Sequence, residues 1–286
     1  MNENNNITER FISIERVIAS KNRYLLKIIP RPLMKAFKKL IHLNEINAII
    51  YKYRNISGTD FATKLVEEEF KVRVIVENIE NMPLEGRHLI ISNHPLGGMD
   101  GLVLTSEVGK IRSDLYFPVN DILCTLPQFK GVFIPINKYG RNTNNHQILN
   151  DAFSSDSNMI FFPAGMVSRR FKHGIIKDLE WKHTFIKKSI EYKRDIIPVY
   201  TDACNTNFFY RFAKLRKSLG IRFNIELILL PREMFLQRNK TIRLIFGKPI
   251  PYTTFDNSLS TKQWAEKVRN YVYSLKEDSQ SEFLNS

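Results

Sequence analysis

Residues 90–101, which decide the fold, read Ile-Ile-Ser-Asn-His-Pro-Leu-Gly-Gly-Met-Asp-Gly. The apolar start is typical of a buried strand, and a helical pattern begins after Asp100. Between the two, Pro95, Gly97 and Gly98 prevent a continuous helix, so the chain must turn. Ligands of open α/β sheets bind at the carboxyl ends of the strands. The segment therefore predicts an α/β protein with a ligand-binding turn after this strand.

The rest of the chain from residue 70 alternates short apolar runs with helical patterns. We expect strands at residues 72–76, 88–92, 115–119, 132–136, 158–162, 196–200, 224–230 and 241–246. We expect helices at residues 102–108, 144–153, 181–192, 205–218 and 261–275. This alternation predicts a mixed, largely parallel sheet flanked by helices on both faces.

The first 60 residues have helical patterns and many basic side chains, and two prolines near residue 31 interrupt them. An apolar stripe with helical spacing then follows at Leu43, Ile46, Ile50 and Tyr53. We predict an N-terminal helical hairpin at residues 1–60 and an α/β domain at residues 61–286. The hairpin either packs on the main domain with its lysines in solvent or lies on an anionic membrane, and the two alternatives are compatible.

The chain is strongly basic, with 43 Lys and Arg against 29 Asp and Glu and a net charge of +14. Such a surface attracts nucleic acid, anionic lipid or phosphorylated ligands. Because the N-terminal basic residues are interleaved with aliphatic ones, we favour an anionic membrane surface and expect no nucleic acid partner. No apolar run approaches the roughly 20 residues of a spanning helix. We therefore expect peripheral attachment at the cytoplasmic face of a membrane.

The two cysteines, Cys124 and Cys204, match no disulfide or zinc pattern, so we expect them to fill the core and expect no metal site. His94 and Asp100 carry the chemistry. A folded-back turn can bring the carboxylate to one imidazole nitrogen and leave the other nitrogen free as a base. The alternative is that Asp100 only caps the helix that follows and that His94 is an ordinary turn residue.

The surrounding sequence favours the first alternative. Asn93-His94 followed by Asp100-Gly101 resembles the first block of the glycerolipid, or PlsC-like, acyltransferase superfamily. Segments similar to the later blocks follow in the same order, at residues 131–136, 161–170, 196–200 and 247–250. The five residues between His94 and Asp100, where four are common, are similar to the hemolysin-like branch of lyso-ornithine-lipid and lyso-glycine-lipid O-acyltransferases.

The resemblance implies an O-acyltransferase that moves a fatty acyl group from acyl-CoA or an acyl carrier protein (ACP) to the hydroxyl of a lyso-lipid. His94 is then the general base, Asp100 orients it, and no cofactor beyond the thioester donor is needed. Backbone amides of the glycines are candidate donors to the oxyanion. The resemblance places the substrate at Asn93, Gly97, Gly98, Asn137, Lys138, Phe162, Pro163, Gly165, Ser168, Arg169 and Arg170.

Two departures from the family pattern bear on the acceptor. Asn137 stands where enzymes with phosphate acceptors carry an arginine, and Ala164 and Met166 leave the third block without its usual carboxylate. We expect a lyso-glycine or lyso-ornithine type of acceptor, with Arg169 and Arg170 binding its carboxylate or the phosphates of CoA. The alternatives are a 1-acylglycerol-3-phosphate or other lysophospholipid acceptor, an impaired enzyme, and a non-catalytic basic protein that binds membranes or nucleic acid.

Overall fold

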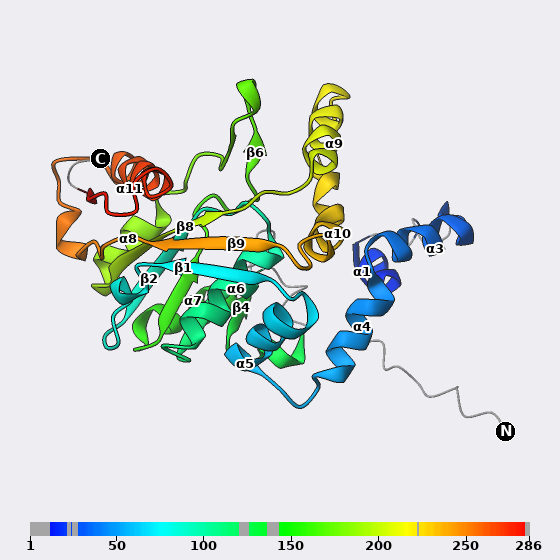
Figure 1. Cartoon of the computed structure of the whole chain (residues 1–286), viewed down its shortest axis with the longest axis horizontal. Helices are drawn as coiled ribbons and strands as arrows, with labels where there is room; N and C mark the ends of the chain where they lie inside the picture. Colours follow the sequence, from blue (N-terminus) through cyan, green and yellow to red (C-terminus); the bar gives the residue numbers. More distant parts are fainter. Residues whose placement is uncertain are drawn as a thin grey trace.

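The computed structural model describes residues 12–21, 24, 28–119, 126–135, 143–221 and 223–283. Its centre is a seven-stranded sheet in the order β1-β9-β8-β2-β5-β3-β4 (Figure 1). The strands are β1 (Arg73–Glu77), β2 (His88–Ser92), β3 (Leu115–Val119), β4 (Phe133–Pro135), β5 (Asn158–Phe161), β8 (Asp195–Asp202) and β9 (Thr241–Phe246). Neighbouring strands are parallel except β8 and β9. The predicted mixed, largely parallel sheet is therefore confirmed.

The helices precede the sheet and connect its strands. The first set is α1 (Ile14–Lys21), α3 (Arg31–Leu40), α4 (Leu43–Lys52), α5 (Gly58–Lys64) and the π-helical turn η1 (Leu65–Glu69). The second set is α6 (Gly98–Gly109), α7 (Thr143–Ser154), α8 (Thr184–Tyr192), α9 (Asn207–Ser218), α10 (Leu230–Phe235) and α11 (Thr261–Ser274). Short 3-10 turns complete the chain at Ile79–Asn81, Pro127–Phe129, Lys172–Gly174, Ile225–Leu229 and Tyr252–Thr254.

Strand β2 is buried on both faces, because helices cover both sides of the sheet. Ile90 faces a core that includes α5, α6 and η1. Leu89 and Ile91 face a second core with side chains of α7, α8 and α11. A strand enclosed in this way reads as a continuous apolar run, which is why the sequence predicted its bounds correctly.

One predicted strand is wrong. Residues 225–229 form the 3-10 turn η6 (Ile225–Leu229), which continues into α10. Leu229 packs with Phe209 and Tyr210 of α9 and with Val167 in a small separate cluster. A short apolar run fits a strand or a buried helical turn equally well, and here packing against α9 decides.

Two smaller features also differ from expectation. A hairpin of β6 (Arg169–Arg170) and β7 (Ile176–Lys177) begins at the end of the third sequence block, where we expected no strands. Cys204 is exposed, so the expectation that it fills the core is wrong. Cys124 lies outside the described residues.

The N-terminal helices use their apolar faces in different ways. Leu43, Ile50 and Tyr53 on the stripe of α4 are buried, whereas α3 has no buried residue. The apolar stripe of α4 is therefore largely covered by protein, whereas α3 leaves Leu33 and Leu40 exposed. Membrane docking and the division at residue 60 stay predictions, and position 60 falls within α5. None of the described helices combines the length and apolar content that a membrane-spanning helix needs.

The packing of α6 on β3 depends on a glycine. A Cβ at Gly101 would lie 2.3 Å from Phe117 Cε1, whereas a Cβ at Gly98 of the same helix would find its nearest neighbour at 3.8 Å. We predict that Gly101→Ala lowers the free energy of unfolding by about 1–3 kcal/mol, because overpacking outweighs the gain in helix propensity. Gly98→Ala is the matched control and should change it little. Denaturant titration of both variants measures this, and equal stabilities would refute the close packing.

Candidate active site

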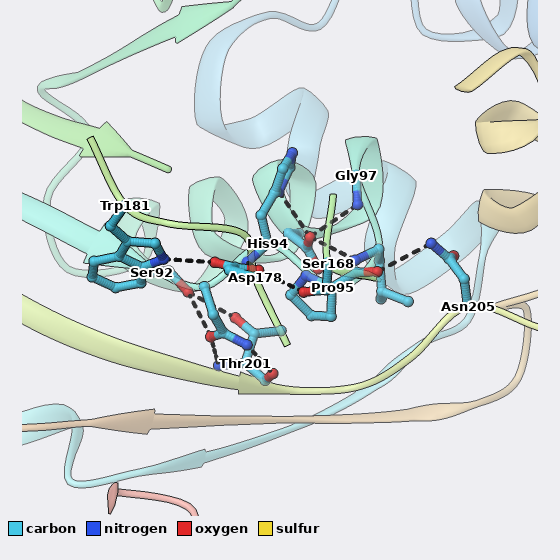
Figure 2. Close-up of polar contacts among 12 residues, drawn as sticks. Ser92, His94, Pro95, Gly97, Ser168, Asp178, Trp181, Thr201 and Asn205 are labelled. Atoms are coloured by element: carbon cyan, nitrogen blue, oxygen red, sulfur yellow. Dashed lines mark hydrogen bonds and ion pairs between the residues drawn. The ribbon is translucent and has the colours of Figure 1, made fainter. Parts of the chain in front are cut away.

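The candidate site begins where β2 ends, at the carboxyl edge of the sheet. Asn93 is buried and pairs with the backbone of β8: its Nδ2 donates to Thr201 O at 2.9 Å, and Thr201 N donates to its Oδ1 at 2.7 Å. The hydroxyl of Ser92 lies 3.0 Å from that of Thr201. These bonds fix the start of the turn to the neighbouring strand (Figure 2). Asn93 therefore serves the turn itself, and a contact with substrate stays a prediction.

Asp100 closes the turn from the first turn of α6. Its Oδ2 accepts hydrogen bonds from Leu96 N at 2.8 Å and Gly97 N at 2.9 Å, and it lies 3.0 Å from His94 Nδ1. Gly97 has φ +86°, and a Cβ there would lie 3.1 Å from Leu230 Cδ1, so the turn requires glycine. Asp100 therefore caps α6 and also contacts the imidazole, and the role of His94 as a base stays a prediction.

The imidazole of His94 is oriented from two sides. Its ring stacks on Phe162 with centroids 4.2 Å apart, and 18% of the side chain is exposed. Figure 2 shows one ring nitrogen directed at the carboxylate and the other directed away from the polar network. The Nδ1 contact has ion-pair length but is not aligned as a hydrogen bond. Catalytic contacts often tighten only when substrate is bound.

Burial dominates the electrostatics of Asp100. Removal from water raises the pKa of this carboxyl, and His94 and the amides of Leu96 and Gly97 oppose the rise. The enclosed carboxylate contacts one nitrogen of the imidazole and leaves the other nitrogen available to a substrate. The arrangement suits a histidine that accepts a proton during a reaction and later returns it.

A second buried carboxylate, Asp178, holds the backbone of this turn and was missed by the sequence analysis. Its Oδ1 accepts from His94 N at 3.2 Å and from Ser168 Oγ at 2.5 Å, and its Oδ2 accepts from Trp181 Nε1 at 2.8 Å (Figure 2). Ser168 N also donates to His94 O at 2.8 Å. Asp178 thus joins the first and third sequence blocks. No motif marks it, since one partner of its carboxylate, His94, lies 84 residues away.

The predicted glycine amides are not equally available. The Gly97 amide donates to Asp100, and the Gly165 amide donates to Phe162 O at 2.9 Å. Gly98 is the first residue of α6, where helix amides have no partner within the helix. Pro163 is buried and its carbonyl accepts from Lys182 N at 3.1 Å. Of the three glycines, Gly98 is therefore the best placed to donate to an oxyanion.

Two arginines that we expected to bind substrate lie on the hairpin. Arg169 Nη2 contacts Glu226 Oε1 at 2.8 Å, and burial lowers the pKa of Arg169. Glu226 is fully buried and also contacts Arg216, so Arg169 is held inside the protein. Arg170 is exposed and donates to Asn207 Oδ1 at 2.6 Å. Its guanidinium is the more accessible of the two.

Other expected features complete the site. Met166, which replaces the usual carboxylate, has its sulfur 3.8 Å from Asn224 Nδ2, and Ala164 is buried in the core. Asn137 and Lys138 lie outside the described residues. Among the residues that are described, no group of three or more His, Cys, Asp and Glu side chains could hold a metal ion.

A turn that presents an oriented histidine at the mouth of an α/β sheet fits a base-catalysed transfer, and comparison with known proteins gives the class. The chain belongs to the acyltransferase family, whose model matches residues 16–281. The protein is therefore an acyltransferase, and we set aside the alternative of a non-catalytic binding protein.

Individual relatives have names that are more specific than that of the family. The lyso-glycine lipid O-acyltransferase of Bacteroides thetaiotaomicron is 42% identical over 266 residues, which are 92% of this chain and 97% of that protein. The protein of the same name from Phocaeicola vulgatus is 41% identical, again over 92% of this chain and covering 95% of its own length. Among solved structures, PlsC, the 1-acyl-sn-glycerophosphate acyltransferase of Thermotoga maritima, aligns over 94% of both chains with 15% identity and a TM-score of 0.45.

The network around Asp178 gives a test of how the site is built. Both carboxylate oxygens of Asp178 accept hydrogen bonds. In Asp178→Asn, the side-chain NH₂ group would replace one of these oxygens and face a donor with which it cannot form a hydrogen bond. We predict a loss of about 1–3 kcal/mol in the free energy of unfolding, together with lower turnover under conditions where the variant is folded. Asp151→Asn, at an exposed carboxylate on α7, is the control and should be neutral. Unchanged stability and turnover in Asp178→Asn would show that this carboxylate does not hold the turn.

Proposed function

We propose that this acyltransferase moves a fatty acyl group from acyl-CoA or acyl-ACP to the hydroxyl of a lyso-lipid, with a lyso-glycine lipid as the acceptor. The observation that carries the proposal is the His94–Asp100 pair at the carboxyl edge of the sheet, with the second imidazole nitrogen directed away from the carboxylate. Two relatives that are named for lyso-glycine lipid acylation and aligned over 92% of this chain support the acceptor.

The pair acts as a general base. The outward nitrogen of His94 takes the proton from the acceptor hydroxyl, and the oxygen attacks the thioester carbonyl. The tetrahedral intermediate then collapses, the carbon–sulfur bond breaks, and the departing thiolate takes the proton from the imidazolium. The products are an ester and a free thiol, and no acyl-enzyme forms. Asp100 stabilises the imidazolium while it exists, and general base catalysis of this kind is worth about 10²–10⁴-fold.

The remaining rate enhancement comes from positioning and from charge stabilisation. The amide of Gly98 at the start of α6 is our candidate donor to the thioester oxyanion, aided by the helix dipole. Arg170 is our candidate for binding the acceptor carboxylate or the donor phosphates, because it is exposed and its guanidinium can form paired bonds to such groups. The reaction needs no cofactor beyond the thioester, and we place the enzyme at the cytoplasmic face of the membrane as a peripheral protein.

Replacing the base tests the mechanism. We predict that His94→Ala lowers acyl transfer by about 10²–10⁴-fold without loss of the fold, because the side chain is partly exposed and carries no structural hydrogen bond of its own. His183→Ala, just before α8, is the control and should keep full activity. The measurement is ester formation by purified protein with lyso-glycine lipid and, separately, 1-acylglycerol-3-phosphate, using acyl-CoA and acyl-ACP as donors. Wild-type activity in His94→Ala would contradict the proposed mechanism. A preference for 1-acylglycerol-3-phosphate would contradict the proposed acceptor.

The variant Asp100→Asn separates the two roles of Asp100, which are to orient His94 and to cap α6. The amide oxygen can still accept from Leu96 N and Gly97 N, but it cannot stabilise an imidazolium, so we predict a fall in turnover on the order of 10²-fold or more. Because burial raises the pKa of Asp100, the folded protein holds this proton more tightly than the unfolded chain. The free energy of unfolding of the wild type, relative to the variant, should therefore fall as the pH rises through the interval between the two pKa values. Denaturant titrations across acidic pH measure this difference, and a difference that rises with pH would contradict it.

A further inference from the structure

A surface with exposed apolar side chains stands beside the candidate site, and the proposed reaction does not use it. It consists of the tip of the β6–β7 hairpin, the outer side of α9 and the chain that follows α9; we call it the docking surface. Its large apolar side chains are 37% to 82% exposed. They are Phe171, Ile175, Phe208, Leu215, Leu219, Ile221, Phe223 and Ile228.

Helix α9 is apolar on two opposite sides. Its inner side, with Phe209, Tyr210 and Ala213, is buried against the protein. Its outer side carries an apolar stripe at positions 208, 212, 215 and 219, the spacing of one helical face, and Phe212 on this stripe is half-buried against the cluster around Phe209. Leu219 is 65% exposed and Phe223, beyond the helix, is 82% exposed. A single stripe would suffice to attach the helix to the domain, so the outer stripe calls for a second partner.

The exposed charged side chains around this stripe are positive. The exposed cations are Arg170, Lys172, Lys177, Arg211, Lys214 and Lys217. The only carboxylate in residues 168–177 and 207–232 is Glu226, which is fully buried between Arg169 and Arg216. Lys172, Lys214 and Lys217 form no ion pair with any described residue. Exposed apolar side chains flanked by lysine and arginine are typical of a helix that lies in the headgroup region of an anionic membrane.

The docking surface is joined directly to the turn that carries His94. Ser168, just before β6, donates its amide to His94 O, and Asn205, just before α9, donates Nδ2 to Pro95 O at 3.0 Å. Leu230 at the start of α10 lies against Gly97. Figure 1 shows the hairpin and α9 projecting from the sheet in the same direction, and Arg170 bonds the two together through Asn207. The apolar stripe therefore starts close to the turn and runs away from it.

We propose that the docking surface binds the headgroup region of an anionic membrane, with the α9 stripe inserted and the lysines among the lipid phosphates. The most exposed apolar side chains of this surface, Leu219 and Phe223, lie at and beyond the end of α9, which suits insertion among lipids better than ion pairing with an acidic carrier protein. The binding itself does not depend on the chemistry at His94. That the surface brings lipid to the catalytic turn rests on the proposed function.

Vesicle binding by the full chain tests the proposal without any reaction. The variant Leu215→Ser/Leu219→Ser/Phe223→Ser should bind vesicles of phosphatidylcholine with phosphatidylglycerol on the order of 10–100-fold more weakly than the wild type, because three apolar side chains no longer insert. The matched control is Ile75→Ser/Leu84→Ser/Ile190→Ser, at residues that are 38%, 74% and 40% exposed outside the docking surface. Lys214→Gln/Lys217→Gln should weaken binding roughly fivefold per lysine on these vesicles and leave binding to pure phosphatidylcholine unchanged.

The outcomes separate the alternatives. Equal weakening by the docking-surface and control triples would overturn the proposal, as would wild-type binding by the docking-surface triple. If that triple binds vesicles normally but loses transfer from acyl-ACP and keeps transfer from acyl-CoA, the surface binds the carrier protein instead. His94→Ala should bind vesicles like the wild type, so failure of the acyl transfer hypothesis would leave this result intact. Circular dichroism of each variant confirms that it is folded.

Discussion

The arrangement depends on one buried carboxylate that is shared between a backbone turn and an imidazole. Asp100 is 1% exposed and meets two amides and His94 Nδ1 through a single oxygen. Burying a carboxylate is costly unless donors surround it, so the turn can exist only in the form that supplies those donors. The same constraint explains Gly97, whose positive φ lets its amide reach the carboxylate. The carboxylate that stabilises the turn is thus the carboxylate that contacts the imidazole.

Much of this arrangement was predictable from the sequence, because it is local or strongly patterned. The bounds of β2, β3 and β9 follow from buried apolar runs, and the approach of His94 to Asp100 follows from a turn that glycine and proline impose. The prediction of a strand around Ile225–Leu229 was wrong for the opposite reason. Its apolar residues carry no period that separates a strand from a helical turn, and contacts with α9, distant in the chain, decide its form.

Long-range polar contacts explain what the sequence could not show about the site. Asp178 gives no local signal, yet it links the His94 amide, Ser168 and Trp181. Arg169 looked like a free cation, but Glu226, 57 residues further along the chain, holds it. Both are buried ionic groups, whose partners must be supplied by the fold as a whole. Sequence motifs identify the residues that face the chemistry more readily than the residues that hold them in place.

The candidate site lies where the docking surface joins the sheet. A lyso-lipid has one hydrophobic chain and cannot leave the membrane without exposing that chain to water, at a cost of about 0.8 kcal/mol for each CH₂ group. An acyltransferase that acts on such a lipid gains by bringing its base to the interface rather than extracting its substrate. The hairpin and α9 are bonded to the turn on either side of His94 and carry apolar side chains with lysines. Contact between these elements and lipid would hold the imidazole next to the layer in which the acceptor hydroxyl lies. On this proposal, the rigidity that the buried carboxylates give to the turn would fix the imidazole relative to the membrane as well as to the sheet.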